Sequence, residues 1–460
     1  MRTTWDSGRP GRLYAYTSGI TSALALVLQR PDGSLTADPT EMDALLRDAC
    51  GPIFKLYASF HEPPWEPFET RFGAYIVSNP LAAPPLTGDE LRTTLKRQSI
   101  RTACGPDGWR VAELRALPPF FLDHLATLLT CVETQGRWPR ALRQAWVTLI
   151  PKGASPSPLD QRPISVASAV YRLWAATRLR YAVEWQHGWI YPSQCGFRPQ
   201  HSAVDAFYTI AVAVEEALLS NKPLTGAFLD YAKCFDRLPH GVLLSLAHRA
   251  GMDEMVLRPL RAIYADLERR FKVGGGIGLP FKPTNGILQG CPLSVIVNLL
   301  QAVWTRAVTA ETQADPTSYA DDATLLGDRP AVQAAGSVTL RFCDLTGQVL
   351  NTKKCLAFDT STDTTPLQFD AQALPMGTVT RCLGANLTLS TTAEQAPFVQ
   401  ERFDRALNSL RRIGHLPLSF GQRTSMAMAQ SCAAVLYGAE VTDWTPTQVH
   451  RWEGALLTAL

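Results

Sequence analysis

Several signals are missing from this chain of 460 residues, and each absence removes a class of protein. Ten cysteines occur without a Cys-x-x-Cys pair and without a nearby set of Cys and His at the spacing of zinc ligands. Neither a disulfide scaffold nor a zinc knuckle is therefore predicted. We expect an intracellular, reducing environment in the cytoplasm, the nucleus or both. The sequence identifies no protein partner.

Long hydrophobic runs are missing as well. The longest apolar stretch near the start, residues 20–28, is too short to span a membrane and lacks a small-residue cleavage site. We therefore expect no membrane association. There is no internal repeat and no low-complexity tail. Apolar residues make up 46% of the chain, which is enough to bury two or three cores, so a globular protein is predicted.

The net charge is small, at +3, but the basic residues are grouped. Three basic groups lie at residues 137–198, 261–272 and 402–423. A single arginine in any of them is most simply a solvated helix face. Taken together beside a metal site, the groups favour contact with a nucleic-acid backbone.

Three acidic or glycine-containing motifs carry the strongest positive signal. Residues 228–236 read FLDYAKCFD, residues 286–294 read GILQGCPLS and residues 319–322 read YADD. Mg²⁺ takes oxygen ligands and needs one or two carboxylates plus substrate phosphates, so Asp230 and Asp321 are the predicted metal ligands. Two such ions, Mg²⁺ or alternatively Mn²⁺, can activate an attacking hydroxyl and neutralise the leaving group of a phosphoryl displacement. The motifs therefore predict nucleotidyl transfer.

The two adjacent aspartates are expected to have different roles. Neighbouring residues of a strand point to opposite faces, so Asp321 and Asp322 cannot both reach one ion from a regular strand. We predict that they sit on a turn, with Asp321 as the primary metal ligand and Asp322 as a supporting ligand. An isolated motif of this kind would more simply be a solvated turn.

The ordered motifs resemble the reverse transcriptase of a non-LTR, LINE-like retrotransposon and, more distantly, group II intron reverse transcriptases. The matching blocks are GPDG at 105–108, LIPK at 149–152, RPIS at 162–165, QCGFR at 194–198, the aspartate block at 228–236, QG at 289–290, YADD at 319–322, LN with a lysine at 350–354 and CLG at 382–384. The chain departs from the family at Val295, where proline is usual, and at Cys382, where tyrosine is usual. Neither change removes a catalytic group.

The resemblance implies an α+β fold shaped as a right-hand polymerase. Its parts are expected to be an N-terminal extension at 1–85, fingers with the N-terminal reverse transcriptase elements at 86–222, a palm of antiparallel sheet and helices at 223–386, and a helical thumb at 387–460. The chain stops inside a helical pattern, so we expect a truncated thumb.

The resemblance also implies an RNA-directed DNA polymerase that extends the 3′-hydroxyl of a DNA primer with dNTPs on an RNA template during retrotransposition. The carbonyl of Tyr231 would complete the coordination of the metal. The nucleotide-binding residues would be Lys152, Arg162, Tyr231, Phe235, Gln289 and Gly290. Phe235 would act as a steric gate against the ribose 2′-hydroxyl, and Lys354 would protonate the departing pyrophosphate, with Lys353 as a competing candidate.

Two alternatives stay open. An RNA polymerase of the same palm architecture would use ribonucleotides, and Phe235 argues against it. A catalytically inactive or repurposed fragment would bind RNA without extending a primer, and the intact carboxylates argue against long decay.

Hydrophobic periodicity predicts the main elements. Helices are predicted at 41–57, 87–97, 121–133, 166–186, 203–219, 240–249, 255–269, 397–413 and 421–437. Strands are predicted at 145–150, 225–229, 271–273, 318–319, 323–327 and 354–358.

Overall fold

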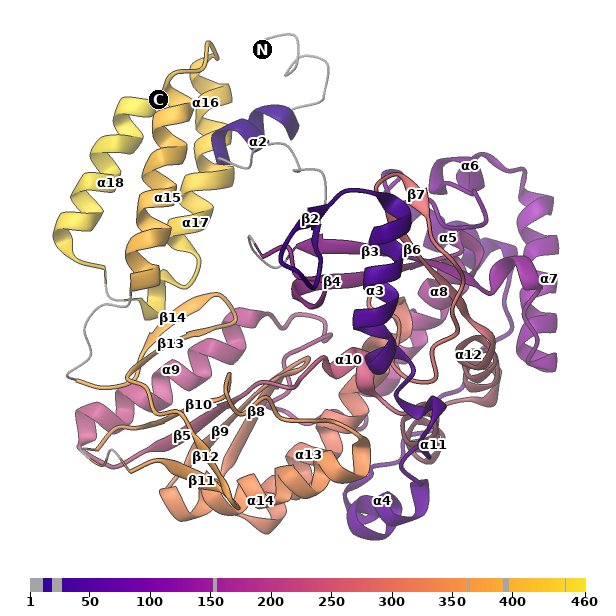
Figure 1. Ribbon diagram of the computed structural model, residues 1–460, viewed down its shortest axis with the longest axis horizontal. Coiled ribbons are helices and arrows are strands. Elements are labelled where there is room, and N and C mark those ends of the chain that lie inside the picture. The colour runs from indigo at the N-terminus through magenta and orange to yellow at the C-terminus, as the bar shows by residue number, and fades with distance from the viewer. Residues whose placement is uncertain are drawn as a thin grey trace.

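The computed structural model describes residues 11–18, 27–151, 155–361, 363, 365–391, 397–442 and 444–460. These residues form a mixed fold of helices and mostly antiparallel sheets (Figure 1). Two sheets have four strands each, and three smaller sheets have two strands each within the described ranges. The predicted α+β class is confirmed.

A central sheet with the strand order β10-β5-β9-β8 is antiparallel throughout. Its strands are β10 (Leu356–Asp359), β5 (Thr225–Leu229), β9 (Asp322–Gly327) and β8 (Asp315–Tyr319). The side chains alternate between the two faces, as a pleated strand requires. Both faces are covered, which explains why β9 is buried at four consecutive positions.

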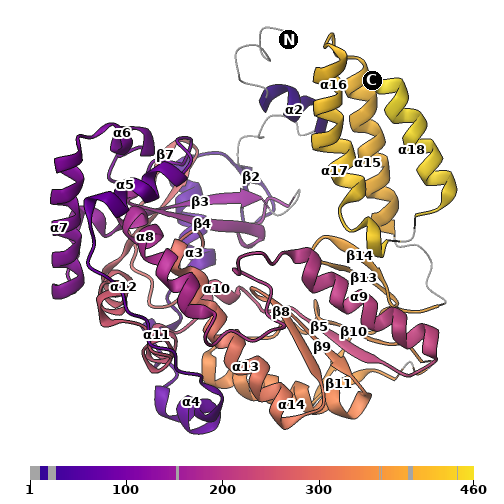
Figure 2. The ribbon, with the colours of Figure 1, turned by 180° about the vertical axis from the view of Figure 1, so that it is seen from behind.

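Helices cover the two faces of the central sheet. On one face, Ala227 and Leu325 join the main core with α13 (Val297–Glu311) and α14 (Arg329–Thr346). On the other face, Leu326 and Phe358 pack against α9 (Ala203–Ser220) and the hairpin of β13 (Val379–Cys382) and β14 (Ala385–Thr388) (Figure 2). The sheet is therefore held as a rigid layer between two helical layers.

A second sheet, with the order β4-β3-β6-β7, lies beside the first. Its strands are β4 (Gln161–Ala167), β3 (Gln144–Pro151), β6 (Glu268–Val273) and β7 (Gly276–Ile277). β3 pairs with β6 in parallel and with β4 in antiparallel orientation. The strands β6 and β7 fall in the range 223–386 by sequence but pair with a strand from 86–222. The chain thus leaves the central sheet after β5 and returns to it at β8.

Helices surround the second sheet. α3 packs on it through a separate core that includes Met42, Leu46, Val147 and Phe271. The helices of this half are α3 (Pro39–Phe54), α4 (Trp65–Phe72), α5 (Gly88–Arg97), α6 (Val111–Ala116), α7 (Pro119–Gln135), α8 (Ala169–Gln186), α11 (His240–Arg249) and α12 (Glu254–Asp266). The short elements are β1 (Leu28–Gln29), β2 (Leu35–Thr36), α10 (Cys234–Arg237), β11 (Leu367–Phe369) and β12 (Gln372–Leu374).

The C-terminal bundle stands above the central sheet in Figure 1 and includes one helix from near the N-terminus. Its members are α2 (Gly11–Ser18), α15 (Pro397–Gly414), α16 (Phe420–Ala427), a π-helical segment (Met428–Cys432), α17 (Ala433–Leu436) and α18 (Pro446–Ala459). Leu13, Ile413 and Met426 share its core. Arg402 ties the bundle to the β13–β14 turn, because its guanidinium donates to the carbonyls of Gly384 and Tyr437.

One described helical stretch, Pro292–Glu311, has the length and hydropathy of a membrane span. Of its most apolar window, 83% is buried inside the protein. It packs in the main core beneath the central sheet, where a core helix has the same composition.

Several predicted boundaries were wrong. The helix predicted at 41–57 ends at Phe54, the strand predicted at 271–273 begins at Glu268, and the helix predicted at 421–437 is interrupted by the π-helical segment. The helix predicted at 166–186 begins only after Ser168, whose side chain accepts a hydrogen bond from the amide of Tyr171, because 161–167 form β4. The helix predicted at 255–269 ends at Asp266, because β6 begins at Glu268. The helices α13 and α14 were not predicted.

Candidate active site

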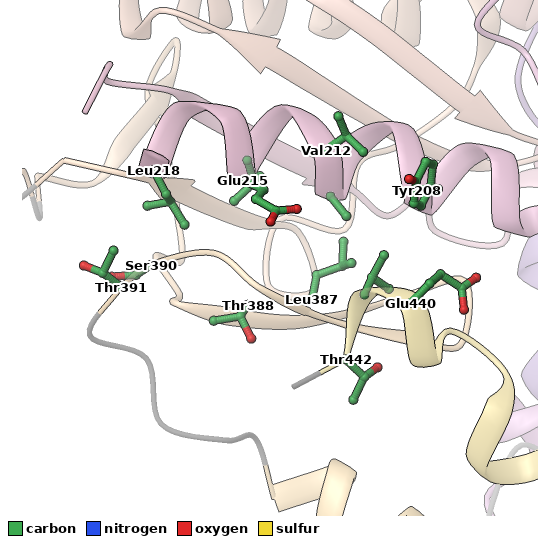
Figure 3. A pocket seen from close by; sticks show the side chains of 13 residues that line it. Tyr208, Val212, Glu215, Leu218, Leu387, Thr388, Ser390, Thr391, Glu440 and Thr442 are labelled. Carbon is green, nitrogen blue, oxygen red and sulfur yellow. The ribbon is translucent and has the colours of Figure 1, made fainter. Parts of the chain in front are cut away.

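Two cavities of about 470 Å³ each open on the molecule, and their chemistry distinguishes them. One lies between α9, the end of β14 and residues 440–442 (Figure 3). Glu215 and Glu440 are the charged residues among its described lining, and the rest is apolar or hydroxyl-bearing. The other lies between the central sheet and β4 and is lined by both carboxylates and cations. The second cavity is therefore the candidate active site.

Four carboxylates are among the residues that line this cavity, and three of them, Asp230, Asp321 and Asp322, come from the central sheet. Asp230 follows β5, Asp321 lies in the two-residue turn between β8 and β9, and Asp322 is the first residue of β9. They come together because β5 and β9 are neighbours, with Leu229 opposite Ala323. The structure thus brings together the three aspartates that the sequence singled out. Asp321 lies on the predicted turn, but the same prediction is wrong for Asp322, which pairs with Tyr319 as the first residue of β9.

A segment distant in sequence supports the turn. Ala320 has a φ of +57°, in the left-handed region. The amide of Cys195 donates to the carbonyl of Ser318 at 2.8 Å. Gly196 lies directly behind the turn, where an added Cβ would be 2.3 Å from the backbone nitrogen of Ala320. The QCGFR block therefore fixes the backbone that carries Asp321.

The loop before β10 fixes the backbone of Asp230. The amide of Asp230 donates to Sγ of Cys355 at 3.3 Å, and the carbonyl of Asp230 accepts from the amide of Asn351 at 2.8 Å. Tyr231 forms an isolated antiparallel β-bridge with Leu350. Its hydrogen bonds are made by the flanking residues, from the amide of Ala232 to the carbonyl of Val349 and from the amide of Asn351 to the carbonyl of Asp230, so the bridge does not use the carbonyl of Tyr231. The Tyr231 side chain is buried.

The electrostatics of the side of the cavity that carries Asp230, Asp321 and Asp322 favour a bound cation. Desolvation in the cavity, followed by the negative charges of Asp321 and Asp230, raises the pKa of Asp322 to about 6. The carboxylates offer oxygen ligands, which suit a hard divalent ion. Among the described residues, no group of three or more His, Cys, Asp or Glu is arranged to hold a metal ion by itself. This incomplete set fits an ion that keeps waters and takes further oxygens from substrate phosphates.

Cations and an aromatic ring complete the lining. Arg162 reaches the cavity from β4, and Lys354 reaches it from the turn before β10. Both side chains are exposed. Phe235 lines the cavity from α10. Lys353 is exposed but is not part of the described lining, which favours Lys354 of the two lysines. The predicted Lys152 lies outside the described residues.

The two predicted residues of the QG motif differ in their surroundings. Gln289 lines the cavity. Gly290 has a φ of +111°, and an added Cβ would be 3.2 Å from the carbonyl of Ser165 on β4. Its backbone conformation and its packing on β4 both favour glycine. Gly290 itself is not among the described lining residues.

Other lining residues were not predicted as part of the site. Lys233 has a φ of +52° and donates from Nζ to the carbonyl of Leu159 at 2.6 Å. This hydrogen bond joins a lining residue of the cavity to a residue 74 positions earlier in the sequence. Asp236 is also a lining residue, although it is 3% exposed, and it accepts a hydrogen bond from Gln289. The sequence motif contained both residues but gave no sign of their partners.

Two arginines of the basic groups do not face solvent. Arg178 is fully buried and pairs with Glu133 at 2.6 Å. Arg269 is 1% exposed. The expectation that these groups face a nucleic-acid backbone is wrong for both residues, because their charges are used inside the protein.

The site combines an acidic hairpin turn with a third aspartate that follows the neighbouring strand, on an antiparallel sheet backed by helices. Such carboxylates suit the metal-assisted phosphoryl transfer of nucleic-acid polymerases. Comparison with known families agrees, since the family described as "Reverse transcriptase (RNA-dependent DNA polymerase)" matches residues 150–370. The matched residues make up just under half of the chain, and this domain is similar to the reverse transcriptases of LINE-like, non-LTR retrotransposons. Reverse transcriptases generally use divalent metal ions.

Three relatives illustrate the similarity. The Pol polyprotein of the type-2 retrotransposable element R2DM of Drosophila melanogaster is 27% identical over 283 residues, which cover 59% of this chain and 26% of that protein. The RNA-directed DNA polymerase from the mobile element jockey of the same organism is 28% identical over 280 residues, 58% of this chain and 30% of that protein. The Transposon TX1 149 kDa protein of Xenopus laevis is 27% identical over 218 residues, 46% of this chain and 16% of that protein. The chain thus spans less than a third of each of these relatives.

Proposed function

We propose that the chain is an RNA-directed DNA polymerase that extends the 3′-hydroxyl of a DNA primer with dNTPs on an RNA template, in retrotransposition. One observation carries the proposal. The carboxylates of Asp230, Asp321 and Asp322 line a cavity whose lining also contains Arg162 and Lys354. This combination of acidic and basic groups suits a metal-bound triphosphate. The relative from jockey, named as an RNA-directed DNA polymerase, supports the same reaction.

The carboxylates would hold two Mg²⁺ ions, with Mn²⁺ as an alternative. Asp230 and Asp321 would be the principal ligands, with Asp322 and the carbonyl of Tyr231 as supporting ligands. When bound, the ions would promote attack by the primer hydroxyl and neutralise the charge of the leaving group. The protein itself would fix the geometry, because hydrogen bonds hold the backbones of Asp230 and Ser318 on either side of the site.

The cations would bind the triphosphate. Arg162 can donate two parallel hydrogen bonds to phosphate oxygens, and Lys152 would add a point charge. Lys354 would donate a proton to the departing pyrophosphate. Its position in the cavity lining supports this role.

The remaining lining would select the nucleotide. Phe235 would exclude a ribose 2′-hydroxyl, which favours deoxynucleotides over ribonucleotides. Gln289 and Gly290 would lie against the incoming nucleotide. This role for Phe235 also distinguishes the proposal from an RNA polymerase of the same architecture.

We assign the larger parts by analogy with a right hand. The central sheet and its helices would form the palm, at 223–386, and the second sheet with its helices would contribute the fingers, at 86–222 together with β6 and β7. The C-terminal bundle would form the thumb, at 387–460. The segment 1–85 would be an N-terminal extension that packs on the second sheet through α3.

The test is primer extension by the purified chain on an RNA template with Mg²⁺. Extension with dNTPs that is lost in Asp321→Ala and kept in Asp315→Ala supports the proposal, because Asp315 is an exposed aspartate of the same hairpin outside the cavity. Preferential extension with ribonucleotides would instead support an RNA polymerase. Retained binding of template and primer without any extension would support an RNA-binding fragment.

A further inference from the structure

A buried carboxylate lies at the floor of the cavity. Asp236 is 3% exposed, and its Oδ2 accepts a hydrogen bond from Nε2 of Gln289 at 2.9 Å. Its carbonyl accepts from Nδ2 of Asn285 at 2.6 Å. The residue is therefore held through its backbone while its side chain holds a residue that lines the cavity.

Asn285 fixes this arrangement from the N-terminal side. It is fully buried, donates from Nδ2 to the carbonyl of Ile53 at 2.7 Å and accepts at Oδ1 from the amide of Leu56 at 2.9 Å. Both partners lie at the end of α3 and just after it. The segment before the second sheet thus helps to hold the floor of the cavity.

A buried cation stands near the same carboxylate. Arg269 is 1% exposed, and its Nε and Nη2 make no hydrogen bond within the described residues. Its guanidinium lies over the ring of Phe54 at 5.5 Å, and it is attracted by the charge of Asp236. A buried charge needs such a partner. Burial lowers the pKa of Arg269, and the charge of Asp236 opposes this shift.

The chemistry of this carboxylate determines how Gln289 is oriented. Oδ2 of Asp236 accepts the hydrogen bond from Nε2 of Gln289, so the amide nitrogen of Gln289 points toward the carboxylate. Its Oε1 is then the remaining polar atom of a side chain that lines the cavity, and it has no hydrogen-bond partner among the described residues.

We infer that Asp236 is a positioning residue that fixes the amide of Gln289 with its oxygen toward the cavity, where it accepts a hydrogen bond from a donor group of the incoming nucleotide. This inference rests on the proposed function. Asp236 lies at the floor of the cavity, and the proposed role is exerted through its hydrogen bond to Gln289.

The variant that tests this role is Asp236→Asn, which keeps the shape of the side chain but adds a donor. An asparagine can pair with either end of the Gln289 amide, so the orientation is no longer fixed. We expect the KM for dNTPs to rise roughly tenfold with little change in kcat, the size of one lost hydrogen bond to a charged group. A purely structural role would lower the melting temperature and kcat instead.

A double-mutant cycle gives the sharper test. Asp236→Asn added to Gln289→Ala is expected to raise KM no further than Gln289→Ala alone. Independent, multiplicative effects of the two substitutions would overturn the inference. Asp43→Asn is the matched control, because Asp43 is also a buried carboxylate, at 4% exposure, but binds Arg47 and the amide of Leu279 away from the cavity.

A spectroscopic measurement separates failure of the inference from failure of the proposed function. In protein labelled with ¹⁵N-glutamine, the side-chain amide signal of Gln289 can be assigned by its loss in Gln289→Ala. We expect this signal to shift in Asp236→Asn and to stay in place in Asp43→Asn, whether or not the chain extends a primer. An unchanged signal in Asp236→Asn would overturn the inference, whereas absence of dNTP extension by the wild type would overturn the function alone.

Discussion

Replacing Gly196 with alanine tests whether the support behind the acidic turn matters for the reaction. An added Cβ would be 2.3 Å from the nitrogen of Ala320 and 3.1 Å from its Cα. Cβ contacts below 3.0 Å are essentially absent from proteins, so the two segments must separate by at least 3.0 − 2.3 = 0.7 Å. The contacted atoms belong to the backbone, so no side-chain rotation can relieve the clash.

The expected effect follows from this displacement. The turn carries Asp321 one residue after the contacted nitrogen, so the carboxylate moves with it. A misplacement of about 1 Å in a reacting group can lower a rate by about 100-fold. Overpacking in a well-packed region costs about 1–3 kcal/mol of stability. We therefore expect Gly196→Ala to lose about 100-fold in kcat while the protein remains folded at moderate temperature.

The assay is single-nucleotide extension of a primer on RNA, together with thermal unfolding. Gly51→Ala is the matched control, because no atom lies within 4 Å of its added Cβ and it sits inside α3. This control should keep its activity and gain about 0.5–1 kcal/mol of stability. Wild-type kcat and melting temperature in Gly196→Ala would refute the reasoning that the turn depends on this contact.

Three further predictions concern pH, substrate choice and stability. The pKa of Asp322 is raised to about 6, so protons compete with Mg²⁺ for this carboxylate below that pH. The Mg²⁺ concentration for half-maximal extension should therefore rise as the pH falls through 6, and a constant concentration would contradict this. Phe235→Ala should raise the use of ribonucleotides relative to dNTPs by about 10- to 200-fold in competition assays, and an unchanged ratio would exclude a gate at this position. Glu133→Gln should lower the free energy of unfolding by about 3–5 kcal/mol in urea, because it leaves the fully buried Arg178 unpaired; a loss under 1 kcal/mol would mean that water reaches the pair.

The elements nearest to the acidic residues were the most predictable. The strand predicted at 225–229 coincides with β5, and the turn at Ala320 and Asp321 lies where the sequence indicated it. Short runs of apolar and β-branched residues ended by carboxylates give a local signal. Such signals depend on neighbours in sequence, which the motif contains.

The buried helices were harder to predict. α13 is buried at eleven of its fifteen positions, so it has no polar face to produce a helical period. β6 contains the buried Arg269, and its charged residues extended the preceding helical pattern instead of marking a strand. Hydrophobic periodicity therefore fails to predict an element that is buried on all sides or that contains a buried charged residue.

The candidate site shows the same division between local and distant information. The motifs named the lining residues Asp230, Asp321 and Gln289. They did not reveal that Cys355 binds the amide of Asp230, because the two residues are separated by 125 positions. Nor did they reveal the bond between Asp236 and Gln289, 53 positions apart. Contacts of this kind arise from the packing of the folded chain, for which one sequence has no local pattern.

The return of β6 and β7 to the second sheet limits how this enzyme can be divided. A cut between residues 222 and 223 would remove from β3 the parallel neighbour that covers its inner edge, leaving its backbone groups unpaired. The C-terminal piece would keep the whole central sheet, but the second sheet would be complete in neither piece, so the two lobes cannot be exchanged between related elements as independent units. Recombination that keeps the second sheet in one piece must transfer residues 144–277 together, and this range also carries β5 and Asp230, the proposed metal ligand that follows it.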